Sequence, residues 1–186
     1  EVNAYIEING QKYDIKLINI IEKERPDIVH LHCLNGYFVN IYKLLTYLKE
    51  NNIKTILSLH AEFMYTGSCG HSYECDKWKT GCGECPQLWD ASKSYYLDRT
   101  NTAWSNMNSV FSGFDNLVIT SVSKWLHNRA KLSPILKNKN LMIVQNGIDN
   151  KNIFYNRNFD KVKNELDIKD EKILLYVTAN FSDRNE

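Results

Sequence analysis

The sequence has 186 residues, 43% of them hydrophobic and 24% charged, and its formal net charge at pH 7 is +1. A chain of this length can form one good-sized domain, or one domain and part of another. No apolar run reaches the roughly 18 residues that span a bilayer, and the start, EVNAYIEING, lacks the basic and apolar regions of a signal peptide. Without these features, a cytoplasmic location is expected. The near-neutral net charge gives no general case for nucleic-acid binding.

Helical and strand patterns alternate along the chain. Apolar residues at helical spacing predict helices, and short apolar runs predict buried parallel strands. In chain order we expect a helix over 13–25, a strand over 27–32, a helix over 36–49, a strand over 55–59, a helix over 92–114, a strand over 117–120, a helix from Lys124, and strands over 141–144 and 172–177. This order predicts an α/β protein with a Rossmann-like open parallel sheet and flanking helices.

An irregular, Gly- and Cys-rich insertion at about 60–90, which we call the cysteine loop, interrupts this order. It contains four of the five cysteines, Cys69, Cys75, Cys82 and Cys85. Four thiolates satisfy tetrahedral zinc without an open position, and the last two cysteines have the spacing of a metal knuckle. The loop therefore predicts a structural zinc site, with disulfides or free thiols as the alternatives. We expect no catalytic metal.

Polar residues follow the predicted strands, at the edge where open parallel sheets bind ligands. His30 and His32 flank Leu31 in one strand, so their side chains point to the same face. His60 ends the next strand, and a neutral imidazole there could exchange hydrogen bonds with a ligand hydroxyl near pH 7. A buried structural histidine is the alternative for His60.

Two further segments follow predicted strands. Asn35 and Gly36 stand at a predicted helix N-terminus, whose free N–H groups could meet an anion or a hydroxyl, with plain helix capping as the alternative. The run Asn146-Gly147-Ile148-Asp149 predicts a tight turn, with the glycine at positive φ.

Four blocks of sequence follow one another between about residue 26 and residue 154. They are PDIVHLHCLNGYFVNIYKLL, LSLHAEFMYTGSCGHSYECDKWKTGCGECP, ITSVSKWLHNRAKLSP and IVQNGIDNKNIF. In this order and at this spacing they resemble the bacterial family 4 glycosyltransferases that build surface polysaccharides. The resemblance implies a retaining enzyme with two Rossmann-like domains (GT-B), which moves a sugar from a nucleotide-sugar donor to a saccharide or lipid-linked acceptor.

The resemblance also implies which residues touch substrate. His60 would be the catalytic residue, close to the donor sugar and the acceptor. Substrate-binding roles carry over to His32, Asn35, Gly36, Glu62, Ser123, Asn146, Gly147 and Asp149. In the family an acidic residue often follows the histidine directly, whereas this chain has Ala61 there and Glu62 next.

A division into two domains follows from the same resemblance. Residues 1–146 are interpreted as part of the N-terminal acceptor-binding domain. Residues 147–186 are interpreted as the interdomain linker and the first strand of the C-terminal nucleotide-sugar-binding domain. A family member would have a strand and a Gly-rich loop before this chain and most of a second domain after it. We therefore expect an internal piece that is inactive by itself.

Other interpretations remain open. Lys124, His127, Arg129 and Lys131 form a basic helix face that could contact an anionic membrane surface or simply be solvated.

The alternative function for the protein is a zinc-stabilised binding module without catalysis. Another Rossmann enzyme is disfavoured, because no Gly-x-Gly-x-x-Gly follows any predicted strand.

Overall fold

The structure is a computed structural model, and it describes residues 10–36, 38–91, 94, 96–155, 157–169, 171–175 and 177. The chain divides into two compact units, Glu1–Asn146 and Gly147–Glu186. The roles predicted for these two parts, binding of the acceptor and of the nucleotide-sugar, stay predictions.

Four parallel strands form one sheet in the first unit. They are β1 (Val29–His32), β2 (Thr55–Leu59), β3 (Leu117–Ser121) and β4 (Asn140–Ile143), and they lie side by side in this order. Leu31, Leu57 and Ile119 pair across the first three strands, and none of these side chains is more than 7% exposed. The two central strands, β2 and β3, have no exposed residue, and they carry apolar runs as covered parallel strands do.

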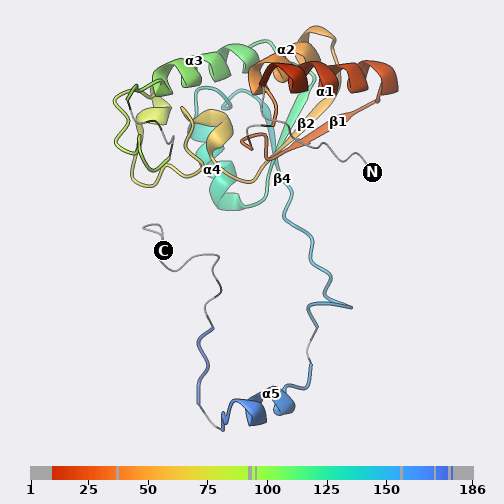
Figure 1. Cartoon of the computed structure of the whole chain (residues 1–186), viewed down its shortest axis with the longest axis vertical. Coiled ribbons are helices and arrows are strands. Elements are labelled where there is room, and N and C mark those ends of the chain that lie inside the picture. Colours follow the sequence, from red (N-terminus) through yellow and green to blue (C-terminus); the bar gives the residue numbers. More distant parts are fainter. Residues whose placement is uncertain are drawn as a thin grey trace. The chain divides into compact units, whose positions relative to one another are not determined.

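Helices flank this sheet. They are α1 (Gly10–Glu24), α2 (Ile41–Glu50), α3 (Thr100–Phe111) and α4 (Lys124–Leu132). Figure 1 shows the first three along the sheet, with α2 in contact with both α1 and α3, while α4 packs on β3 and β4. The arrangement confirms the predicted α/β, Rossmann-like fold. No helix in the described part of the chain is both long and apolar enough to cross a membrane.

The core lies between the helices and the sheet. α2 buries Leu44, Leu45 and Leu48 along one stripe, and α3 buries Met107 and Phe111. Burying one such side chain is worth roughly 1.5–3 kcal/mol relative to leaving it in water. The apolar spacing that predicted these helices is therefore also what attaches them to the sheet.

Two helices begin later than their apolar spacing predicts. α2 begins at Ile41, because the Asn40 side chain accepts a hydrogen bond at 3.1 Å from the backbone N–H three residues on. α3 begins at Thr100, whose N–H donates to the Asp98 carboxylate at 2.8 Å. In both cases a short polar side chain sets the first turn of the helix.

The second unit has one short helix among its described residues, α5 (Asp160–Glu165). The strand predicted over 172–177 is absent from the part of that segment that the structure describes. Its apolar side chains are exposed, Leu174 by 96% and Val177 by 82%. A strand requires a hydrogen-bonded neighbour, and the described residues of this unit provide none.

Candidate functional site

Three histidines meet at the carboxyl ends of β1 and β2. The ring centroids of His30 and His32 lie 4.1 Å apart, as expected for two side chains on one face of a strand. Nδ1 of His32 lies 3.0 Å from Nε2 of His60, and this hydrogen bond joins the two strands. Both rings of the pair are exposed and therefore accessible to a ligand.

Side-chain hydrogen bonds continue from this cluster across the sheet. Nε2 of His30 lies 2.9 Å from the Ser58 hydroxyl, which in turn lies 2.7 Å from the Thr120 hydroxyl. A hydroxyl can donate and accept at once, so one continuous chain of hydrogen bonds links β1, β2 and β3. This chain fixes the orientation of the His30 ring next to His32.

A cavity of about 110 Å³ lies beside His60. Its wall is mostly apolar, with polar groups from Asn35, Ser58 and His60. An apolar wall with a few convergent polar groups is typical of ligand sites, although complete ligand pockets measure about 300–1,000 Å³. This cavity is therefore large enough for one end of a ligand. Its lining includes no Lys, Arg, Asp or Glu.

The surroundings of His32 favour its uncharged form. Partial burial, followed by the neighbouring His30 and His60, lowers the pKa of His32 below its usual 6.5. In the neutral pair one ring nitrogen donates and the other accepts, whereas two protonated rings would have no acceptor between them. Near pH 7 the site thus offers hydrogen bonds to a ligand without a fixed charge.

The carboxylate of Glu62 lies inside the protein, and this corrects the predicted substrate contact. The residue is 0% exposed. Its Oε1 accepts hydrogen bonds from the Tyr65 hydroxyl at 3.0 Å and from Nε of Arg129 at 2.5 Å. Its Oε2 accepts from the Ser72 N–H at 2.6 Å, from the Ser72 hydroxyl at 3.0 Å and from Nδ1 of His71 at 3.0 Å. Glu62 therefore attaches the cysteine loop to α4 and has no oxygen left for a substrate.

Hydrogen bonds keep this carboxylate ionised in spite of its burial. Burial by itself raises the pKa of Glu62, but the bonds from Ser72, Arg129 and His71 outweigh it and hold the pKa below the usual 4.5. The guanidinium of Arg129 also lies 5.1 Å from the ring centroid of Trp78. α4 thus contributes an ion pair and a cation–π contact to the loop.

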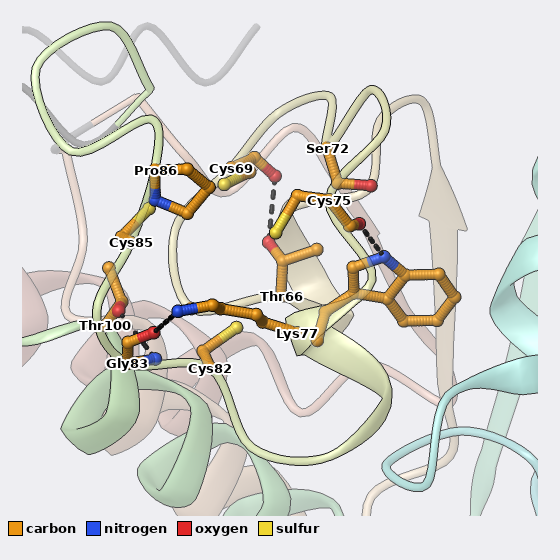
Figure 2. A pocket seen from close by; sticks show the side chains of 12 residues that line it. Thr66, Cys69, Ser72, Cys75, Lys77, Cys82, Gly83, Cys85, Pro86 and Thr100 are labelled. Atoms are coloured by element: carbon orange, nitrogen blue, oxygen red, sulfur yellow. Dashed lines mark hydrogen bonds between the residues drawn. The ribbon is translucent and has the colours of Figure 1, made fainter.

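The four cysteines of the loop line one small cavity of about 10 Å³, which Figure 2 shows from close by. All four are free thiols. Burial, and then the proximity of Cys85, Cys82 and Cys75, raises the pKa of Cys69 to about 12. Among the described residues no three Cys, His, Asp or Glu side chains are already grouped to hold a metal ion. Support for the zinc prediction is therefore the shared cavity, not a preformed coordination shell.

The backbone around Cys82 makes a sharp turn. φ is +140° at Gly81, +55° at Cys82 and +100° at Gly83. Glycine adopts these angles without steric cost, whereas a residue with a Cβ rarely does. Nζ of Lys77 donates to the Gly83 carbonyl at 3.1 Å and so holds the turn. The turn brings Cys82 and Cys85 to the same cavity.

Residues at the start of α3 hold the other side of the loop. The Asp98 carboxylate accepts a hydrogen bond from the Cys85 N–H at 2.6 Å, and the Thr100 hydroxyl accepts one from the Gly83 N–H at 3.0 Å. Gly67 packs so closely here that an added Cβ would lie 2.4 Å from the Thr100 carbonyl oxygen. The loop is thus fixed by α3 and α4 together.

Asn35, Gly36 and Ser123 are further predicted site residues in the first unit. Asn35 lines the same cavity as His60. Neither it nor Gly36 stands at a helix N-terminus, because α2 begins later, and this corrects the prediction for both. The Ser123 hydroxyl accepts a hydrogen bond from the Leu126 N–H at 3.2 Å, so the serine caps α4. Its contact with substrate stays a prediction.

The segment 146–149 does not form the predicted tight turn. Gly147 does not have a positive φ. The turn begins instead at Asp149, whose Oδ1 accepts hydrogen bonds at 3.1 and 2.8 Å from the N–H groups two and three residues on. Asn146 belongs to the same unit as His60, whereas Gly147 and Asp149 belong to the other unit. Their contact with substrate stays a prediction.

Only part of the predicted basic face of α4 is exposed to solvent. Arg129 is paired with Glu62, and His127 is 8% exposed. Burial, and then the nearby Lys131, lowers the pKa of His127, which favours its neutral form. Lys124 and Lys131 remain exposed. A basic residue near an anionic membrane is worth about 1 kcal/mol, so two lysines give only weak attraction.

Sequence patterns missed the side chains that connect the elements. Ser58 and Thr120 meet because their strands are paired in register, and Arg129 reaches Glu62 from a helix far along the chain. The one available signal was Glu62 itself, since an acid just after a buried strand requires a cationic or N–H partner if it is covered.

The fold and the site define an α/β protein with a polar cluster at the carboxyl ends of its parallel strands. No family model matches the sequence, and no solved structure gives a significant match. The chain is similar to the Escherichia coli (strain K12) protein named "Putative colanic acid biosynthesis glycosyl transferase WcaC", with 24% identity over 129 residues. The similar region is 67% of this chain and 32% of that protein, so the chain spans about a third of its relative. This similarity supports a relationship to glycosyltransferases.

Proposed function

We propose that the full-length protein is a retaining glycosyltransferase of family 4, with the GT-B architecture. It transfers a sugar from a nucleotide-sugar donor to a saccharide or lipid-linked acceptor in surface-polysaccharide synthesis. The similarity to WcaC and the Rossmann-like sheet support the class of protein. The observation that carries the site is the His32–His60 pair, joined at 3.0 Å beside a cavity of about 110 Å³.

The proposal gives each histidine a separate role. Their mutual bond uses Nδ1 of His32 and Nε2 of His60, which leaves one ring nitrogen on each for a ligand. His60 exchanges a hydrogen bond with a sugar hydroxyl in the cavity, and His32 fixes the tautomer and orientation of that ring. In this proposal His60 touches substrate, and His32 acts mainly as a positioning residue.

The charge of the cavity supports an acceptor site rather than a donor site. A nucleotide-sugar carries a diphosphate, which proteins bind with Arg, Lys or the N-terminus of a helix. The lining residues include none of these cations. An uncharged saccharide matches this lining better, so we assign this part of the protein to the acceptor.

The test uses the full-length protein and a panel of UDP-, GDP- and dTDP-sugars. Thermal stabilisation reports donor binding, and released nucleotide reports turnover. His60→Ala should keep the stabilisation by the donor and lose turnover by about 100-fold or more, the usual size of a lost proton-transfer or hydrogen-bonding group. Glu50→Gln, an exposed change at the far end of α2, is the control and should keep full turnover.

Two results would overturn the proposal. If no donor stabilises the protein, a zinc-stabilised binding module without catalysis becomes the better description. If His60→Ala turns over as fast as the wild type, the strand-end cluster is not the reaction site.

A further inference from the structure

The cavity of the cysteine loop admits nothing larger than an ion. At about 10 Å³ it has roughly the volume of one water-sized sphere. A sugar ring, a nucleotide or a peptide side chain cannot enter it. Four of the chain's five cysteines nevertheless line it, and Cys69 is buried there while Cys75, Cys82 and Cys85 are half-buried. A function for this site must therefore involve something as small as a single ion.

The side chains on the cavity wall select the kind of ion. The lining contains four thiols and no Asp, Glu or His. His71 is close in sequence, but its Nδ1 is bonded to Glu62 and it does not line the cavity. An all-sulfur set is the donor set of zinc and other soft metals, and it does not suit Mg²⁺ or Ca²⁺, which take oxygen ligands. Four protein ligands also leave no open position for catalysis.

Groups around the cavity suit a negatively charged metal–thiolate cluster. Gly67 lines the cavity together with Cys82, and a backbone N–H next to a thiolate typically supports its binding to a metal. Lys77 lines the cavity, and its ammonium group is held 3.1 Å from the Gly83 carbonyl. A fixed cation next to four thiolates offsets part of their charge.

We propose that Cys69, Cys75, Cys82 and Cys85 bind one structural zinc ion in the cavity that they line. Because the described side chains are not yet grouped around a common centre, binding requires the thiols to lose their protons and turn toward the middle of the cavity. The metal then joins the two halves of the cysteine loop. Its free energy of binding adds to the hydrogen bonds from α3 and α4.

Metal analysis of the purified protein is the first test. We expect about one zinc ion per chain, with four sulfur ligands at about 2.3 Å by X-ray absorption. Cys82→Ser and Cys85→Ser should each lose the zinc. Cys33→Ser is the matched control, because Cys33 lies at the end of β1 and lines the other cavity, and it should keep the full metal content. Zinc retained equally by all three variants would overturn the proposal.

A second measurement needs no variant, in case the serine variants fail to fold. The wild-type protein is treated with a chelator and then titrated with Co²⁺ alone. We expect the intense thiolate-to-cobalt absorption of a tetrahedral sulfur site, saturating at one equivalent, and four thiols that resist alkylation until chelator is added. A folded, metal-free protein whose four thiols alkylate freely would overturn the proposal, as would disulfides among them.

The zinc proposal does not depend on the proposed transfer reaction. None of these measurements uses a sugar donor or acceptor, so a protein without transferase activity could still hold zinc. Equally, a metal-free protein that turns over a nucleotide-sugar would overturn the zinc site and leave the proposed function in place.

Discussion

The parallel sheet and the cysteine loop are stabilised by different forces. Leu57 and Ile119, at 1% and 0% exposure, contribute to the sheet through burial of apolar surface, which has no preferred direction. Glu62 contributes to the loop through five hydrogen bonds with fixed geometry. Packing can adapt when a side chain changes, whereas a buried ion pair that loses one partner leaves the other uncompensated.

This difference bears on the candidate site, because both regions meet there. His60 directly follows β2, and Glu62 comes two residues later. The sheet positions the start of this segment, and the Glu62 network positions its continuation. Damage to the loop should therefore disturb the histidine pair even though no loop cysteine lies in its cavity.

The largest effect is expected from Glu62→Ala. Removing the carboxylate leaves Arg129 and the Ser72 N–H without their partner inside the protein, and breaking a buried pair in this way costs about 3–5 kcal/mol. Urea unfolding should show this loss of stability. Glu74→Ala, an exposed acid of the same loop, is the control and should change stability by less than about 0.5 kcal/mol. An equally small loss of stability for Glu62→Ala would show that the cysteine loop does not depend on this buried ion pair.

Acid should loosen the loop before the sheet, with a smaller effect than Glu62→Ala. The folded-state pKa of Glu62 lies below 4.5, so its ionised form stabilises the protein fully above about pH 4.5. This contribution is lost as the pH falls through the lower, folded-state value. A protonated carboxyl still fills its space and keeps some hydrogen bonds, so part of the stability remains. Hydrogen exchange at acid pH should show early loss of protection at the Ser72 amide, with the β2 amides still protected. Simultaneous loss at both places would contradict the prediction.

The elements of the sheet could be predicted because apolar spacing determines them. The 55–59 strand was predicted with its observed bounds, and the burial of Leu57 and Leu59 is what the run of apolar residues indicates. The 36–49 and 92–114 helices were predicted too long at their N-terminal ends, since Asn40 and Asp98 begin α2 and α3 through hydrogen bonds that apolar spacing does not report.

The site was predictable in part. His32 and His60 were expected at neighbouring strand ends, and strand order brings them together. The location of Glu62 was not predictable, because its neighbourhood depends on Arg129 from α4 and on Ser72 from the loop. A contact between residues so far apart in the chain follows from packing of whole elements, not from local sequence.

A smaller effect is expected from Ser123→Ala, which removes one hydrogen bond to a neutral hydroxyl at a half-buried place. The Ser123 hydroxyl caps α4 by accepting the Leu126 N–H at 3.2 Å, and loss of such a cap costs typically about 1 kcal/mol. Water can replace part of this bond, which is why the loss is smaller than for Glu62. Ser105→Ala, within the exposed face of α3, is the control and should be neutral or slightly stabilising. Equal destabilisation by both variants would show that capping is not the cause.

The smallest effect is expected at the histidine pair, and it concerns protonation more than stability. Partial burial, then His30 and His60, holds the pKa of His32 below 6.5, so its neutral form is favoured above that pH and gives way to the protonated form as the pH falls through the folded-state value. NMR titration of the ring should give a midpoint below 6.5 for His32. In His60→Ala the midpoint should rise, because one of the groups that disfavour protonation is gone, while burial and His30 keep it below 6.5. A wild-type midpoint at or above 6.5 would show that burial and the neighbouring rings do not disfavour the charged form of His32, and it would contradict this description of the site.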